Sequence, residues 1–194
     1  FAGGNYASRN IVAMNEAIEA DKKTKNILTN ETIVNDWVTL YQTTNDPKKK
    51  ARALKAISKD YKVPVEAVKA LDEASTVFEG DKGFTKKELI EYGNAIGQIE
   101  SGYKTKVQIG GGPARSYWQV EPKTALDLLN NSSAIFGKKF EELFSGKSKY
   151  TYSGDGQSAV KYLSSLSEEK MSILLKRDDT LAAVMALAVI VNRK

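Results

Sequence analysis

The sequence predicts a mainly α-helical protein. Apolar residues recur at helical spacing in eight segments, several of these segments begin with helix-start residues, and no segment joins strand-like alternation to hairpin turn residues. A chain of 194 residues, 41% of them hydrophobic, is long enough to bury a real core. The predicted helices span residues 6–20, 31–42, 47–60, 64–77, 85–100, 122–130, 157–166 and 178–191.

Helix-start signals support several of these segments. Thr85 is followed three residues later by Glu88, the pattern of a capping box, and so predicts the start of helix 85–100. Pro47 fits the first turn of helix 47–60, and either Asp178 or Asp179 can cap the last helix. A small ribbon is expected near residues 106–109.

A break in the helical pattern predicts two parts. Two glycines and two acidic residues interrupt the helices within residues 79–83. We therefore predict an N-terminal helical region over residues 1–83 and a second helical domain over residues 84–194. The apolar run from residue 181 to 191 is too short to span a bilayer, so it is expected to be a buried helix.

Composition excludes several kinds of chemistry. The chain has no Cys and no His, which excludes Ser-His-Asp and Cys-His nucleophiles, His-bearing zinc motifs and disulfides. We expect no metal and no organic cofactor. The formal charge of +5 favours polyanionic partners. The clearest basic run, residues 48–50 with Arg52, is interpreted as the solvated face of a helix, with DNA or membrane contact as the alternative.

Two segments point to a sugar-cleaving site. The first ends an apolar helix with Glu100-Ser101. An acid in a partly dry place favours its neutral form, as a general acid for a glycosidic oxygen requires, so we expect Ile96 and Ile99 to bury this helix end. The second segment carries aromatic and amide side chains that can stack on and hydrogen-bond to sugars. It reads Gly112-Pro113-Ala114-Arg115-Ser116-Tyr117-Trp118-Gln119-Val120-Glu121-Pro122-Lys123-Thr124-Ala125.

The two segments together resemble the lysozyme-like lytic transglycosylases, which are related to goose-type lysozymes. The resemblance covers about residues 85–130. The second segment looks most like the peptidoglycan-cleaving domains of bacteriophage virion proteins. The resemblance implies a lysozyme-like helical domain, preceded here by a small helical segment. Many members also have a late Tyr that closes over the substrate; the last helix of this chain has none, and Tyr150 or Tyr152 is a possible substitute.

The resemblance implies a reaction with a single catalytic residue, Glu100. It would protonate the oxygen between N-acetylmuramic acid and N-acetylglucosamine. The resulting carboxylate would then take a proton from the muramoyl primary hydroxyl, which closes on the anomeric carbon. Such substrate-assisted cleavage needs no paired carboxylate.

Six further residues are expected at the substrate-binding site, the five described here and Glu121. Gln119 contacts an acetamido group, orients Glu100 or fixes the loop, and Ser101 contacts substrate, bonds to Glu100 or caps the loop. Tyr117 and Trp118 are adjacent, so one can face sugar and the other the core. Arg115 is expected to bind a phosphate or a stem-peptide carboxylate, with a surface salt link as the alternative.

Glu121 is the nearest second acid. It is interpreted either as the acid at the start of the next helix or as a group that activates water. The second interpretation would make the protein a muramidase, a glycosidase that hydrolyses the same bond.

The protein is expected to be part of a phage particle and to act in the host periplasm or cell wall. There the enzyme would degrade peptidoglycan locally for genome ejection, with glycan strands and other virion proteins as its partners. The alternative is a catalytically silent structural virion component with a lysozyme-like fold. A DNA- or membrane-contacting helical protein is the third hypothesis.

Overall fold

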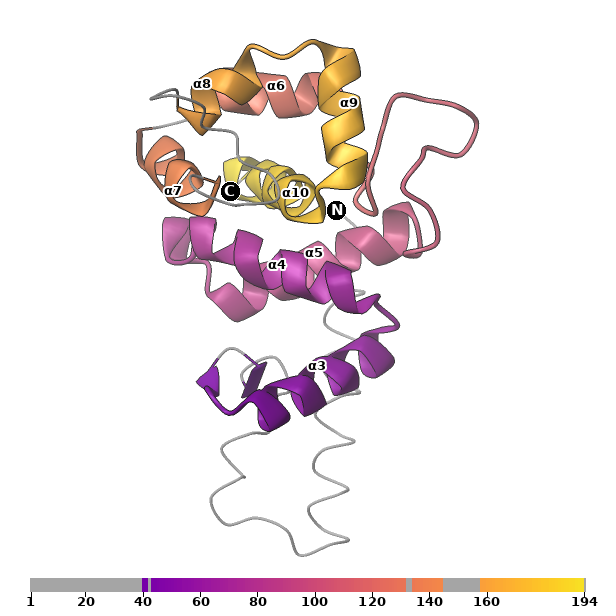
Figure 1. Cartoon of the computed structure of the whole chain (residues 1–194), viewed down its shortest axis with the longest axis vertical. Helices are drawn as coiled ribbons and strands as arrows, with labels where there is room; N and C mark the ends of the chain where they lie inside the picture. Colours follow the sequence, from indigo (N-terminus) through magenta and orange to yellow (C-terminus); the bar gives the residue numbers. More distant parts are fainter. Residues whose placement is uncertain (1–39, 42, 132–133, 145–157, 194) are drawn as a thin grey trace, which may run out of the picture.

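The structure is a computed structural model that describes residues 40–41, 43–131, 134–144 and 158–193. Among these residues 72% are helical and none lies in a strand, so the predicted mainly α class is confirmed. Figure 1 shows the helices in layers, with one helix lying between the others. The expected ribbon is reduced to single bridges between Val107 and Arg115 and between Arg115 and Val120.

Helix α10 (Asp179–Arg193) is the centre of the core. Every residue from 181 to 188 is buried, as expected of a helix that is apolar on all sides. Helices α4 (Val65–Phe78) and α5 (Lys86–Glu100) pack against it from one side, and α6 (Pro122–Asn130) and α9 (Glu168–Arg177) from the other (Figure 1). Within the described ranges, no helix has the length and apolar character needed to cross a membrane.

Two predicted helix starts are confirmed. The Thr85 side chain accepts a hydrogen bond from the Glu88 amide at 3.1 Å, and the Glu88 carboxylate accepts one from the Thr85 amide at 3.2 Å. At the last helix, Asp178 rather than Asp179 acts as the cap, accepting from the Leu181 amide at 3.0 Å. These bonds satisfy backbone amides that the first helical turn leaves without partners.

Most other predicted helices have close counterparts. Helix α3 (Pro47–Tyr61) and helix α8 (Ala159–Ser164) lie where the periodicity placed them. The sequence reading missed α7 (Ala134–Phe144), which contains Gly137, and α9, whose buried apolar residues span little more than one turn. The predicted helix 6–20 and most of the predicted helix 31–42 lie outside the described residues.

The predicted boundary coincides with a tight turn. The short 3-10 helix η2 (Asp81–Gly83) separates α4 from α5, and its flanking Gly80 has a positive φ of 83°. Packing nevertheless continues across the turn, because α4 contacts both α5 and α10. One hydrophobic cluster runs from Tyr41 to Val191. Helix α4 and the helices after the turn therefore share a core.

Helix α5 approaches its neighbours through two glycines. A Cβ atom at Gly93 would overlap the side chain of Leu71 on α4 and lie 3.3 Å from Leu187 on α10. A Cβ atom at Gly97 would overlap the ring of Tyr103. The absence of side chains therefore sets the spacing of α4, α5 and α10, and also seats the Tyr103 ring against α5.

We predict that Gly97→Ala destabilises the fold by about 1–3 kcal/mol, because the added methyl group displaces a packed aromatic ring. This loss should exceed the gain of about 1 kcal/mol that Ala brings to a helix. The matched control is Gly137→Ala on α7, where nothing lies within 4 Å of the position that the added methyl group would take. Urea unfolding should show a loss for the first variant and none for the second; equal changes would contradict the packing argument.

Candidate active site

Glu100 is the last residue of α5, and its side chain is exposed. The expectation that apolar neighbours bury this helix end is wrong. Ile96 is buried at 6% exposure, but Ile99 is 47% exposed. The packed face of α5 ends with Ile96 and Gly97, and the final turn extends beyond it into solvent. The free chain thus presents Glu100 openly and does not hold it in a dry pocket.

Ser101 joins the two sequence motifs. Its hydroxyl lies 2.6 Å from the carbonyl oxygen of Tyr117 and 3.2 Å from that of Gly97, and it accepts a bond from the Tyr103 amide at 3.1 Å. The loop-capping interpretation of Ser101 therefore describes its contacts. Because Ser101 follows Glu100 directly, this bond places the Tyr117 backbone beside the end of α5.

The loop that joins α5 to α6, residues 101–121, is held by its own backbone and side chains. Arg115 and Val120 exchange two backbone hydrogen bonds, at 2.9 and 2.8 Å. The Arg115 guanidinium donates to the carbonyl oxygens of Gly112 and Ala114, each at 2.8 Å. The Gln119 amide donates to the carbonyl oxygen of Ser116 at 2.8 Å. Arg115 and Gln119, two of the residues expected to bind substrate, thus make contacts that fix the loop.

Three non-glycine residues adopt positive φ angles in this loop. The angles are 57° at Tyr103, 74° at Ser116 and 50° at Gln119. Left-handed backbone is disfavoured for such residues, by roughly 1–2 kcal/mol each. Residues in this conformation cluster at binding and catalytic sites, where the surrounding structure enforces them.

The two adjacent aromatic residues have different environments. Trp118 is 2% exposed, and its indole N–H donates to the carbonyl oxygen of Gly93 at 2.9 Å. Trp118 is therefore the one of the two adjacent aromatic residues that packs in the core, and its ring is not placed to stack on sugar. Tyr117 is half-buried, with its ring centroid 5.4 Å from that of Tyr103 and 6.0 Å from that of Trp118. Tyr117 is the aromatic residue of the pair that reaches the surface.

Three charged residues that the sequence reading missed surround Tyr117. Its hydroxyl donates to the carboxylate of Glu66 on α4 at 3.0 Å. The Lys106 ammonium lies 4.8 Å from the centroid of the Tyr117 ring and 2.8 Å from the carboxylate of Asp179 on α10. The cluster ties the loop to two core helices. Its members are far apart in the sequence, and no sequence motif predicts that they lie together.

The cluster changes the acidity of two of its members. Burial, the hydrogen bond to Glu66 and the nearby negative charges raise the pKa of Tyr117 to about 12. Burial raises the pKa of Asp179, and the Lys106 ammonium opposes that rise. In both cases burial raises the pKa because it disfavours the charged form of the side chain.

Glu121 lies at the start of α6. It is exposed, has extended backbone angles, and its side chain makes no capping hydrogen bond. It therefore occupies the helix-start position that one interpretation gave it, beside the positive end of α6. Tyr103 is buried at 7% exposure. Tyr150 and Tyr152 lie outside the described residues.

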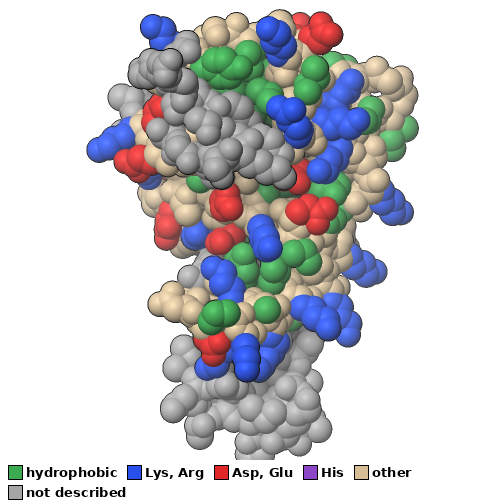
Figure 2. All heavy atoms as spheres, in the orientation of Figure 1, with side chains coloured by type: hydrophobic (Ala, Val, Ile, Leu, Met, Phe, Trp, Pro, Cys, Tyr) green, Lys and Arg blue, Asp and Glu red, His purple; other side chains and the backbone are tan. Residues whose placement is uncertain are grey.

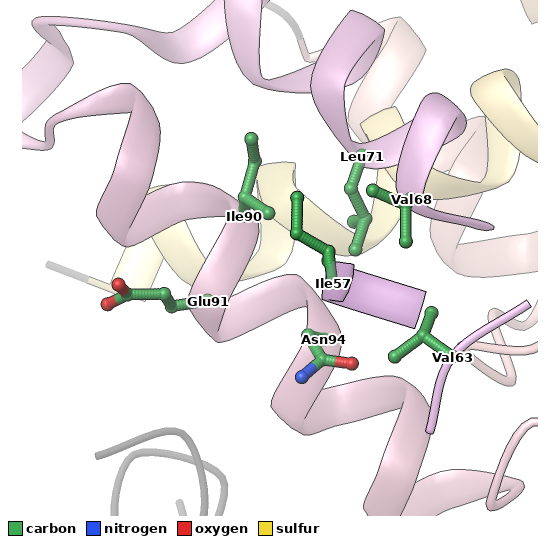
Figure 3. A pocket seen from close by; sticks show the side chains of 7 residues that line it. All are labelled: Ile57, Val63, Val68, Leu71, Ile90, Glu91 and Asn94. Carbon is green, nitrogen blue, oxygen red and sulfur yellow. The ribbon is translucent and has the colours of Figure 1, made fainter. Parts of the chain in front are cut away.

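A separate small pocket lies between α3, α4 and α5 (Figure 3). It spans about 250 Å³, a volume that includes open solvent, and none of the motif residues lines it. Asn94 is 4% exposed there, and neither polar atom of its side chain has a hydrogen-bond partner. The other lining residues are Ile57, Val63, Val68, Leu71, Ile90 and Glu91. In the part of the chain that the structure describes, no group of three acidic residues is arranged to hold a metal ion.

We predict that Tyr117 gives the fold a pH dependence above neutrality. A raised pKa in the folded state means that the stability contribution is complete below pH 10 and is lost as the pH rises towards about 12. Urea unfolding at several pH values should show the wild type losing stability relative to Tyr117→Phe across that interval. Parallel profiles for the two proteins would contradict the prediction.

No protein-family model, no curated protein and no solved structure matches this chain. The candidate site consists of two features: Glu100 is exposed at the end of α5, and the hydroxyl of the next residue, Ser101, bonds to the Tyr117 carbonyl oxygen in the loop.

Proposed function

We propose that this chain is a peptidoglycan lytic transglycosylase with Glu100 as its acid and base. The observation that carries the proposal is the 2.6 Å bond from the Ser101 hydroxyl to the Tyr117 carbonyl oxygen. It supports the proposal because it brings the two motifs of the resemblance side by side. Glu100 is exposed at that junction, where a long polymeric substrate can reach it.

The proposed reaction uses one carboxyl group twice. Glu100 donates its proton to the glycosidic oxygen as the bond from that oxygen to the muramoyl anomeric carbon breaks. The muramoyl N-acetyl carbonyl stabilises the cationic centre. The Glu100 carboxylate then accepts the proton of the muramoyl primary hydroxyl, whose oxygen bonds to the anomeric carbon. The products are a free N-acetylglucosamine hydroxyl and an anhydro sugar, and no water is consumed.

Substrate binding would supply the dry environment that the free chain does not provide. A glycan strand lying over the exposed helix end excludes water from the carboxyl group. The half-buried ring of Tyr117, whose carbonyl oxygen bonds to Ser101, offers an aromatic surface to the glycan. Its bond to Glu66 and its contact with Lys106 hold the ring in place before the glycan arrives.

The biological setting belongs to the same proposal. The style of the second motif favours a bacteriophage particle that contacts the host cell wall during genome ejection. Other virion proteins would then be neighbours of this chain. The same lysozyme-like fold would serve a muramidase if Glu121 activated water, and the products distinguish the two reactions.

A second candidate is a catalytically silent structural component of the particle. Two observations favour it: Glu100 is exposed, and Trp118 is packed in the core away from any ligand. A surface Glu at a helix end is ordinary in proteins that cleave nothing. Such a component would bind glycan or a neighbouring protein without releasing products.

We predict that the wild type releases anhydromuropeptides from purified peptidoglycan and that Glu100→Gln lowers the rate by at least about 100-fold, since general acid catalysis contributes about 10²–10⁴. Mass spectrometry of the soluble products makes the measurement. The matched control is Glu142→Gln, which changes an exposed Glu near the end of another helix, α7, and should leave the rate unchanged.

Other outcomes would select other functions. Reducing-end muropeptides that disappear in Glu121→Gln would identify a muramidase. A folded wild type that binds glycan but releases nothing would overturn the enzyme proposal in favour of the structural component. Equal activity of the wild type and Glu100→Gln would remove Glu100 from the mechanism.

A further inference from the structure

Helix α3 carries a straight row of positive charges. Lys48, Arg52, Lys55 and Lys59 are spaced at i, i+4, i+7 and i+11, which places them within about 60° of one another around the helix at 3.6 residues per turn. All four are exposed, while Ala53 and Ile57 on another side of the helix are buried. At about 1.5 Å per residue, the row is roughly 16 Å long. We call these four residues the α3 basic row.

The lysines in the first turn of α3 work against the stability of the helix, although Asp46 caps this end and Lys59 lies in the last turn, where a basic residue is favourable. Its first turn contains Lys48, Lys49 and Lys50 and no acidic residue. The N-terminal end of a helix is its positive end, where acidic residues stabilise and basic residues destabilise. Sequences usually break such a local rule where function requires it. The positive charge of the first turn is therefore not explained by helix formation.

The charge of the row is not neutralised within the described part of the chain. None of the ion pairs between described residues involves the row. Residues 47–62 contain seven basic residues and one acidic residue. Lys50 lies outside the row, with its ammonium 4.8 Å from the centroid of the Tyr41 ring. Figure 2 shows Lys and Arg side chains over the region where α3 lies in Figure 1.

We infer that the α3 basic row binds the phosphate backbone of duplex DNA without regard to sequence. Duplex DNA is a stiff polyanion with about one charge per 1.7 Å of its axis, which suits a rigid, linear row of cations. No aromatic residue is interleaved between the four positions, so the row lacks the stacking surface that single-stranded nucleic acid uses. Phosphate contacts of this kind position a protein but read no bases. The inference is independent of the proposed cleavage reaction.

Fluorescence anisotropy with two labelled duplexes of unrelated sequence tests the inference. Four phosphate contacts predict a slope of about −3.6 for log K against log salt, which is about a 150-fold loss of affinity between 50 and 200 mM salt. Both duplexes should bind equally. Changing all four residues of the row to Gln should abolish most of the affinity and bring the slope close to zero.

The control variant removes the same charge elsewhere. Lys123, Lys138, Lys170 and Lys176 are exposed on other helices, and changing all four to Gln should preserve most of the affinity and slope. Equal losses in the two variants would overturn the inference, because net charge alone would then explain binding. Tighter binding to single-stranded DNA would also overturn it. So would binding of the row to anionic vesicles or polyglycerol phosphate without binding to the duplex. Thermal unfolding of each variant confirms that it is folded.

Discussion

The close approach of other groups to α5 at Gly93 and Gly97 is the constraint on which the rest of the molecule depends. At Gly93 the helix approaches α4 and α10. The carbonyl oxygen of Gly93 also accepts a hydrogen bond from the Trp118 indole N–H. At Gly97 the Tyr103 ring lies directly against the helix. These contacts fix two aromatic residues of the loop, and the Ser101 bond then fixes the loop backbone. The two glycines of α5 leave room for these contacts, and the contacts set the position of the loop.

The helices could be predicted because their signals are local. Apolar spacing and capping residues act over a few positions, as at Thr85 and Glu88. The exposure of Glu100 could not be predicted in the same way. Periodicity indicates which face of a helix turns inward, but not how far neighbouring elements extend along that face. Ile96 follows the pattern, whereas Ile99 and Glu100 lie beyond the packed region.

The roles within the loop show a second limit of sequence reasoning. An aromatic or amide side chain beside glycines is equally suited to a ligand and to its own loop. Trp118 and Gln119 were ambiguous for this reason, and their partners are Gly93 and Ser116. The contacts around Tyr117 were invisible, because Glu66 is 51 positions away in the sequence. A cluster assembled by tertiary packing leaves no periodic or spaced signal.

The positive φ angles of Tyr103, Ser116 and Gln119 have a consequence for molecular recognition. The folded chain already holds these angles, so the loop does not have to adopt them when a ligand arrives. Ordering flexible side chains and loops at an interface costs about 0.5–1.5 kcal/mol for each immobilised side chain, and a pre-shaped loop avoids much of that entropy loss. Recognition by this loop would then resemble a rigid template meeting a ligand more than a flexible segment closing over one.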